Sequence, residues 1–130
     1  MNIRNEDGYT LLELMVVILI VGILVSLAIV TYAGVQNSGY DTEAKSNARN
    51  GVTAASAYYT SNESSYYGLN AAALAAEVPG INFRNGADPA EPNTVYVSGV
   101  STGGFTLRVL SQSGTLFTAV GDHLASTASF

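Results

Sequence analysis

A single carboxylate stands at the start of a long uncharged run. After Glu13 no charged residue occurs until Asp41. The stretch Leu14 to Val30 alone carries 14 large aliphatic side chains, and about 20 apolar residues suffice to span a bilayer as a helix. A carboxylate beside such a span costs free energy unless a partner or the membrane surface compensates it. The run therefore predicts a membrane-spanning helix, and Glu13 is a candidate functional residue.

The helical pattern continues beyond this run. Small or apolar residues recur at intervals of four, four, three and four, which places them on one face of a helix: Ala44, Ala48, Val52, Ala55 and Tyr59. No proline interrupts residues 9 to 60, although each glycine among them weakens a helix by up to about 1 kcal/mol. We expect one helix from Tyr9 to about Thr60, roughly 80 Å long at 1.5 Å per residue.

The remaining residues predict a small sheet. Ser61 to Ser65 is expected to end the long helix, Leu69 to Glu77 to form a short helix, and residues 80–93, rich in Gly and Pro, to form a loop. Three strand patterns follow, separated by Gly-containing turns: Thr94 to Val100, Phe105 to Leu110 and Thr115 to Val120. We expect an α+β fold in which an antiparallel meander packs its apolar face on the second half of the long helix.

Composition argues against catalysis. The chain has no cysteine and one histidine, His123, which nearly excludes zinc sites and Cys–His chemistry. Asp122 and His123 fit a solvated strand end better than a fragment of a catalytic triad. Asp88 and Glu91 flank Pro89, and a calcium site there is an alternative to a plain loop. We expect no enzyme activity, no cofactor and no metal.

The charge pattern argues against nucleic-acid binding. The formal net charge is −5; removing residues 1–8 would take away one positive and two negative charges and leave −4. Binding to DNA by counterion release needs clustered Lys and Arg. The cations beyond the first eight residues are scattered: Lys45, Arg49, Arg84 and Arg108. We expect no strong nucleic-acid binding.

The segment EDGYTLLELMVVILIVGILVSLAIV resembles the N-terminus of type IV pilins and pseudopilins. That family has a short polar leader ending in Gly, an aromatic residue, Thr-Leu-x-Glu and an apolar helix. The resemblance implies that a prepilin peptidase cuts between Gly8 and Tyr9 and methylates the new amino group of Tyr9. Glu13 then takes the fifth mature position, where the family keeps a glutamate.

The resemblance also implies a division of the chain and the pilin fold. Residues 1–8 would be a removed leader, residues 9–35 the hydrophobic transmembrane and assembly half of the helix, and residues 36–130 the globular pilin domain. The pilin fold is a lollipop, a long helix packed on a small antiparallel sheet. More loosely, NARNGVTAASAYYT, PNTVYV and SGTLFTA are similar to pilins of Gram-positive, especially actinobacterial, type.

Cleavage would give Glu13 a partner. The new α-amino group of Tyr9 has an ordinary pKa of about 8 and is mostly cationic at neutral pH. Paired with the Glu13 carboxylate of a neighbouring subunit, it would lower the burial cost of both charges and set the stagger of the helices. Two alternatives stay open: Glu13 reaches its own amino terminus, or it lies at the membrane surface. Gly22 and Ser26, one turn apart, would let helix backbones approach closely.

The function implied is that of a structural subunit of a type IV pilus. Its partners would be copies of itself, prepilin peptidase and a pilus or secretion assembly machinery. Before assembly it would span the cell membrane once with a cytoplasmic N-terminus; afterwards it would lie in an extracellular filament. The alternatives are a pseudopilin of a type II secretion or competence system, a monomeric membrane-anchored binding module, and a secretory signal peptide ending at Ser26-Leu27-Ala28.

Overall fold

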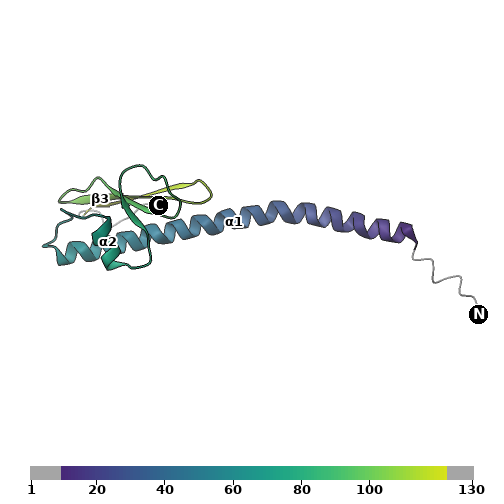
Figure 1. Ribbon diagram of the computed structural model, residues 1–130, viewed down its shortest axis with the longest axis horizontal. Helices are drawn as coiled ribbons and strands as arrows, with labels where there is room; N and C mark the ends of the chain where they lie inside the picture. Colours follow the sequence, from purple (N-terminus) through teal and green to yellow (C-terminus); the bar gives the residue numbers. More distant parts are fainter. Residues whose placement is uncertain (1–9, 123–130) are drawn as a thin grey trace, which may run out of the picture. The chain divides into compact units, whose positions relative to one another are not determined.

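The computed structural model of the chain describes residues 10–122 (Figure 1). The chain divides after Gln36 into two compact units, residues 1–36 and residues 37–130, and each is described by itself. The predicted cleavage and methylation positions, Gly8 and Tyr9, lie outside the described residues, as does His123.

Helix α1 runs from Leu11 to Ser61. It ends where Glu63 and Ser64 adopt left-handed backbone conformations, with φ of 54° and 59°. The Ser64 amide donates to the Tyr59 carbonyl oxygen at 3.0 Å, which satisfies one of the carbonyl groups that a helix end leaves free. The predicted long helix is therefore confirmed.

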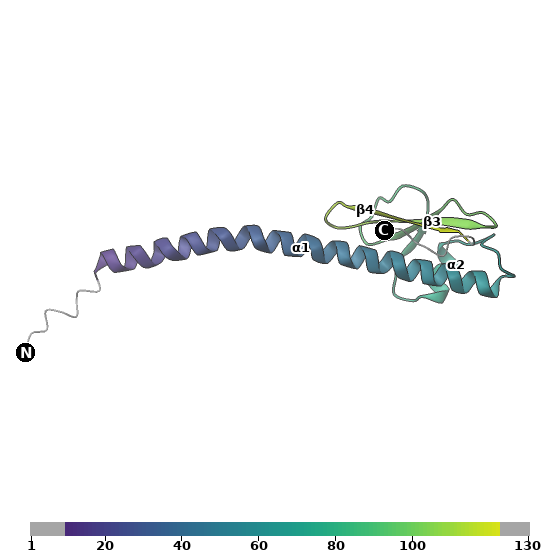
Figure 2. The same cartoon turned by 180° about the vertical axis from the view of Figure 1, so that it is seen from behind.

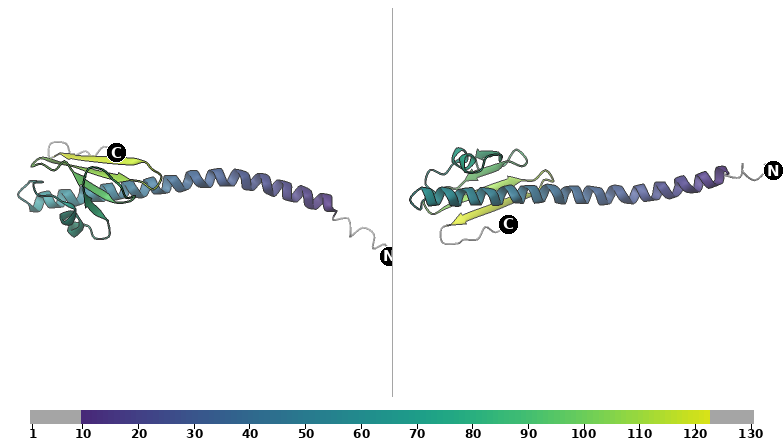
Figure 3. Two further views of the ribbon diagram at one scale, coloured as in Figure 1. Left: turned by 45° about the horizontal axis from the view of Figure 1, so that its top comes forward. Right: turned by 90° about the horizontal axis from the view of Figure 1, so that it is seen from below.

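One face of α1 packs on the sheet in the second unit (Figure 3). The buried residues of the helix are all small: Ala44, Ala48, Gly51, Ala54 and Ala55. The predicted stripe is confirmed, although Val52 and Tyr59 are only partly buried at its margin. Gly51 was not predicted to belong to it. A β-carbon there would lie 2.9 Å from Leu107 Cδ1, so this glycine lets the helix backbone approach the sheet.

The second unit contains a four-stranded sheet in the order β1-β2-β3-β4. Its strands are β1 (Phe83–Asn85), β2 (Val95–Ser98), β3 (Gly104–Leu110) and β4 (Leu116–Asp122). Strands β2, β3 and β4 form the expected antiparallel meander. Figure 2 shows β3 and β4 side by side. The α+β fold class is therefore confirmed.

Strand β1 corrects the prediction that residues 80–93 form only a loop. It pairs parallel with β2, so the sheet is mixed and not purely antiparallel. The Val95 amide donates to the Asn82 carbonyl oxygen and the Gly86 amide to the Val97 carbonyl oxygen, both at 2.9 Å. A three-residue strand is too short to show an alternating pattern, and tertiary contacts stabilise it.

Helix α2 (Ala71–Glu77) begins two residues later than predicted, because Asn70 caps it. The Asn70 Oδ1 atom accepts a hydrogen bond from the Ala73 amide at 3.0 Å, as N-cap side chains do. The Ala71 amide donates to Asn85 Oδ1 at 2.8 Å. The first turn of α2 is thus tied to β1, and Leu74 is fully buried.

The core of the second unit lies between α1, α2 and the sheet. Its largest fully buried apolar side chains are Leu74, Val95, Leu107 and Val109. Tyr66 joins the end of α1 to β3: its ring centroid lies 4.6 Å from that of Tyr59 and 4.8 Å from that of Phe105, the latter edge-on. Such pairs add about 0.5–1.5 kcal/mol beyond burial of their area.

The turn between β3 and β4 is attached to α1 through Asp41. Ser113 Oγ donates a hydrogen bond to Asp41 Oδ1. The same hydroxyl also lies 3.2 Å from Ser111 Oγ and 3.0 Å from Thr115 Oγ1. The hydrogen bonds from Ser113 and then Ser111 hold the pKa of Asp41 below its ordinary value of 3.8, because they stabilise the carboxylate form.

Candidate assembly site

Among residues 10–36, the described part of the first unit, nothing covers the apolar part of α1. Every described residue from Thr10 to Gln36 is exposed, and the best 18-residue window of the helix has a mean hydropathy of 3.1. By length and composition α1 can cross a membrane. A helix that is apolar on all sides is stable only inside lipid or among other apolar helices. This segment is therefore the candidate assembly site.

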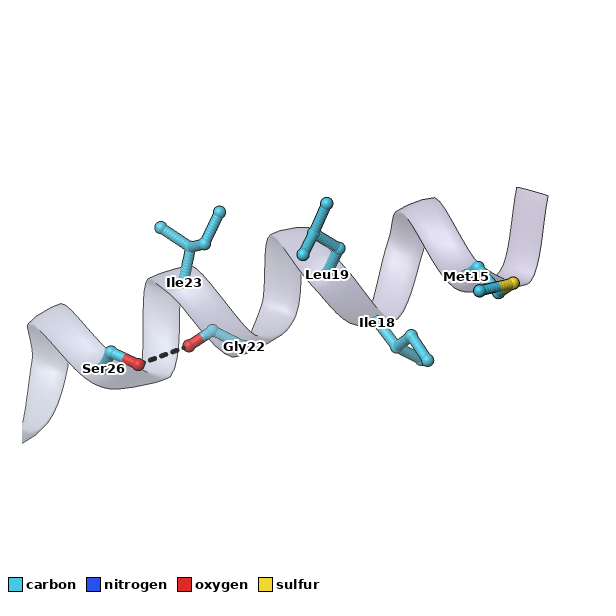
Figure 4. A pocket seen from close by; sticks show the side chains of 6 residues that line it. All are labelled: Met15, Ile18, Leu19, Gly22, Ile23 and Ser26. Atoms are coloured by element: carbon cyan, nitrogen blue, oxygen red, sulfur yellow. Dashed lines mark hydrogen bonds between the residues drawn. The ribbon is translucent and has the colours of Figure 1, made fainter. Parts of the chain in front are cut away.

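A shallow groove lies on one side of this segment (Figure 4). Its lining residues recur every three or four positions: Met15, Ile18, Leu19, Gly22, Ile23 and Ser26. In Figure 4 Leu19 and Ile23 rise on one side of the helix and Ile18 points away from them, with the bare Gly22 between. The four apolar side chains were not predicted as lining residues, although their helical spacing was present in the sequence.

Gly22 has no steric role among the residues that the structure describes. A β-carbon built at this position meets nothing within 4 Å, and a helical glycine costs about 1 kcal/mol relative to alanine. Ser26 Oγ donates to the Gly22 carbonyl oxygen at 2.8 Å, so its hydroxyl needs no other partner in an apolar setting. The structure places the two predicted residues on one face, one turn apart, and their role in assembly remains a prediction.

Glu13 lies in the first turn of α1. Its amide donates to the Thr10 carbonyl oxygen at 2.8 Å, and the Leu14 amide donates to the same oxygen at 3.3 Å. The Glu13 side chain is exposed. A carboxylate in the first turn is favoured by the helix dipole. Because Tyr9 lies outside the described residues, the predicted contact between Glu13 and an amino terminus remains a prediction.

Within residues 10–122 no three His, Cys, Asp or Glu side chains gather as metal ligands would. Asp88 and Glu91 were considered above as calcium ligands. Glu91 forms an ion pair with Arg84, in which Arg84 Nε and Glu91 Oε2 lie 3.1 Å apart. Arg108 donates to the Ala87 carbonyl oxygen at 2.8 Å. Two guanidinium groups therefore contact the loop that holds Asp88 and Glu91.

A model of the prokaryotic N-terminal methylation motif matches residues 3–29 of the chain. The chain carries the class III leader of type IV pilins and pseudopilins. The resemblance predicted from the sequence is thereby confirmed. No curated protein and no solved structure matches the chain.

The matched segment, residues 3–29, contains all five predicted site residues: Gly8, Tyr9, Glu13, Gly22 and Ser26. It supports a type IV pilin or pseudopilin, which is a structural subunit. The leader and the apolar helix together fit membrane anchoring followed by assembly.

Proposed function

We propose that the chain is a structural subunit of a type IV pilus, cleaved after Gly8 by prepilin peptidase, methylated on Tyr9 and polymerised through its N-terminal helix. The observation that carries the proposal is the exposed apolar segment of α1 directly behind a methylation leader. The leader explains how the segment is processed, and the exposed surface explains why copies associate.

The free energy of burial supports polymerisation. The 14 large aliphatic side chains between Leu14 and Val30 would gain about 1.5–3 kcal/mol each when buried, roughly 20–40 kcal/mol together. None of them is buried within the chain. These side chains are therefore unfavourable in water, and two apolar environments can bury them. One is the lipid of the cell membrane before assembly, and the other is the set of helices of other copies in an extracellular filament.

The Glu13 carboxylate would be paired during this transfer. The amino group of cleaved Tyr9 is a cation at neutral pH, and methylation keeps its charge. A carboxylate and an ammonium from adjacent copies compensate each other in a low-dielectric bundle, whereas one of them alone is strongly unfavourable there. The pair would set the stagger of neighbouring helices, and the groove at Gly22 and Ser26 would receive side chains of the adjacent helix.

Substitution of Glu13 tests this pairing. Glu13→Gln keeps the size of the side chain and removes its charge, and Glu13→Asp keeps the charge. We expect Glu13→Gln to insert into the membrane at the normal level but to lose at least about 90% of the sheared filament yield, since 1.4 kcal/mol changes an equilibrium tenfold. Glu13→Asp should retain part of that yield. Normal filament yield from Glu13→Gln would refute the pairing.

Processing is tested separately by intact-mass analysis. The unaltered chain should show a mature species that begins at methylated Tyr9, and substitution of Gly8 by a larger residue should leave the full-length precursor. A mature species from the Gly8 variant would contradict cleavage at this position. A monomeric membrane-anchored module would show neither cleavage nor dependence on Glu13.

A pseudopilin of a secretion or competence system is the second candidate, because the same leader occurs in both groups. Electron microscopy of sheared surface material distinguishes them. Long filaments whose subunits have the mass of residues 9–130 support the role of a pilus subunit. Processed, membrane-associated protein without such filaments supports the pseudopilin.

A further inference from the structure

The two edges of the sheet are protected to different extents. Strand β1 has only three residues and carries the charged Arg84. The loop that follows it contains two prolines, Pro89 and Pro92. Short length, charged side chains and nearby proline are features by which proteins prevent a sheet edge from pairing with another chain. The β1 edge therefore has the usual protection.

Strand β4 lacks these features. It has seven residues, and Leu116 to Gly121 contain no charge and no proline. Its pairing with β3 is continuous from Leu116 to Asp122, without a bulge. In an antiparallel strand every second residue directs its N–H and C=O groups away from its neighbour. At an edge these groups form a row that another strand can pair with.

The side chains of β4 add an apolar row to this edge. Ala119 is buried against the core and Phe117 is partly buried there. On the opposite face Leu116 is 48% exposed and Val120 55% exposed, with the partly exposed Thr118 between them. An exposed and regular edge strand with apolar side chains is a predicted site of association.

We propose that β4 pairs in antiparallel fashion with β4 of a second copy of this chain, about a twofold axis at Thr118. In this register Leu116 lies opposite Val120 of the other copy, and Thr118 opposite Thr118. On the inner face Phe117 lies opposite Ala119. The large Phe117 thus meets the small Ala119, the aliphatic Leu116 meets the aliphatic Val120, and Thr–Thr cross-strand pairs are favourable.

The charges of β4 also tolerate this register. Asp122 is the only charged residue of the strand. About Thr118 it lies opposite Gly114, so the two Asp122 residues stand at opposite ends of the paired strands, about 27 Å apart at 3.4 Å per residue. Like charges directly opposite each other, which oppose strand pairing, do not occur.

A second β4 is also the best complement within the described residues. Among residues 10–122 the sheet has two edge strands, and β1, with three residues including Arg84, is too short to pair along β4. An isologous contact needs only one self-complementary surface. The pairing itself does not depend on the proposed function.

The antiparallel direction of the β4–β4 pairing restricts how two copies can be oriented when they meet. Strand β4 lies beside the second half of α1 and runs roughly along it (Figures 2 and 3). A twofold axis at Thr118 would therefore reverse this part of the helix in one copy relative to the other. Two second units whose segments of α1 point the same way do not meet in this arrangement, whereas two whose segments point in opposite directions do.

Disulfide trapping tests the contact, because the chain contains no cysteine. Thr118→Cys is introduced into the full chain, which is solubilised in mild detergent, oxidised and analysed on non-reducing gels. Thr106→Cys is the matched control: Thr106 is also partly exposed and faces the same side, but it lies one strand inward, opposite Val120. Directly paired residues have Cα atoms about 5.5 Å apart, within disulfide range. Two copies of residue 106 would lie about 20 Å apart, because three strand spacings across the sheet and four residues along the strands separate them.

We expect Thr118→Cys to give at least about ten times more disulfide dimer than Thr106→Cys, given that difference in distance. Adding Val120→Lys to Thr118→Cys should return the dimer to the level of the control, because a lysine on the edge opposes pairing. Circular dichroism verifies that each variant is folded. Equal crosslinking at positions 106 and 118, a monomeric Thr118→Cys, or dimer unaffected by Val120→Lys would overturn the proposal. Coverage of β4 by the residues after Asp122, or by another protein, would produce the monomeric result.

Discussion

Gly121 in strand β4 is a position where the addition of a single methyl group is expected to lower the stability of the fold. It lies opposite Phe105 in β3, and a β-carbon built on it would overlap the Phe105 ring. That ring is 2% exposed and packs edge-on against Tyr66. Gly121→Ala therefore requires the Phe105 ring to move within a filled core.

The expected cost follows from these contacts. Overpacking a core costs about 1–3 kcal/mol, and a weakened Phe105–Tyr66 contact costs about 0.5–1.5 kcal/mol more. Replacing a strand glycine by alanine returns about 0.5–1 kcal/mol of backbone entropy. We expect a net loss of about 1–3 kcal/mol, which lowers the melting temperature of a domain of this size by at least about 5 °C.

Thermal unfolding of the full chain in detergent, followed by near-ultraviolet circular dichroism of the Tyr and Phe residues, measures this loss. The control is the same substitution in a Phe105→Leu background, where the smaller side chain leaves room for the methyl group. There Gly121→Ala should cost less than about 0.5 kcal/mol, because the two residues are in direct contact and their effects are not additive. A Gly121→Ala chain as stable as the original would refute the reasoning.

Two further predictions concern α1. Gly22→Leu should leave the folding of the second unit unchanged, since nothing lies within 4 Å of the new β-carbon; it should reduce filament yield about tenfold or more by filling the groove, while Val21→Leu, beside the groove, should not. Asp41→Asn should lower the melting temperature at neutral pH. Because the pKa of Asp41 is lowered by folding, its contribution is present above pH 3.8 and is lost as the pH falls through the folded value. The melting temperature of the original chain should therefore fall more steeply below about pH 3.8 than that of Asp41→Asn, and parallel pH profiles would contradict this.

The strongly periodic elements of the fold were predictable from the sequence. The long helix follows from an uninterrupted apolar run and from the stripe of Ala44, Ala48 and Ala55. The meander follows from alternation, as in Phe105, Leu107 and Val109. Strand β1 was missed because three residues carry no period, and because each of its residues pairs with a residue 12 positions further along the chain.

Part of the candidate site was also predictable. The motif around Gly8, Tyr9 and Glu13 depends on residue types in a fixed register, and such a pattern needs no tertiary information. The roles of glycines were less accessible. Gly51, Gly22 and Gly121 look alike in the sequence, but the structure puts the first against Leu107, the second against nothing and the third against the ring of Phe105.

The amino-acid sequence alone thus determined the apolar half of α1, its leader and the position of Glu13, because these depend on composition and local spacing. Only the tertiary structure decided which contacts hold the sheet in place. Burial of Phe105 requires glycine at position 121, and the β3–β4 turn reaches Asp41 from 72 residues away in the chain. The structure also leaves β4, which has no charge from Leu116 to Gly121, as the long edge of the sheet. Contacts between distant residues have no local pattern, because they arise only when the chain is folded.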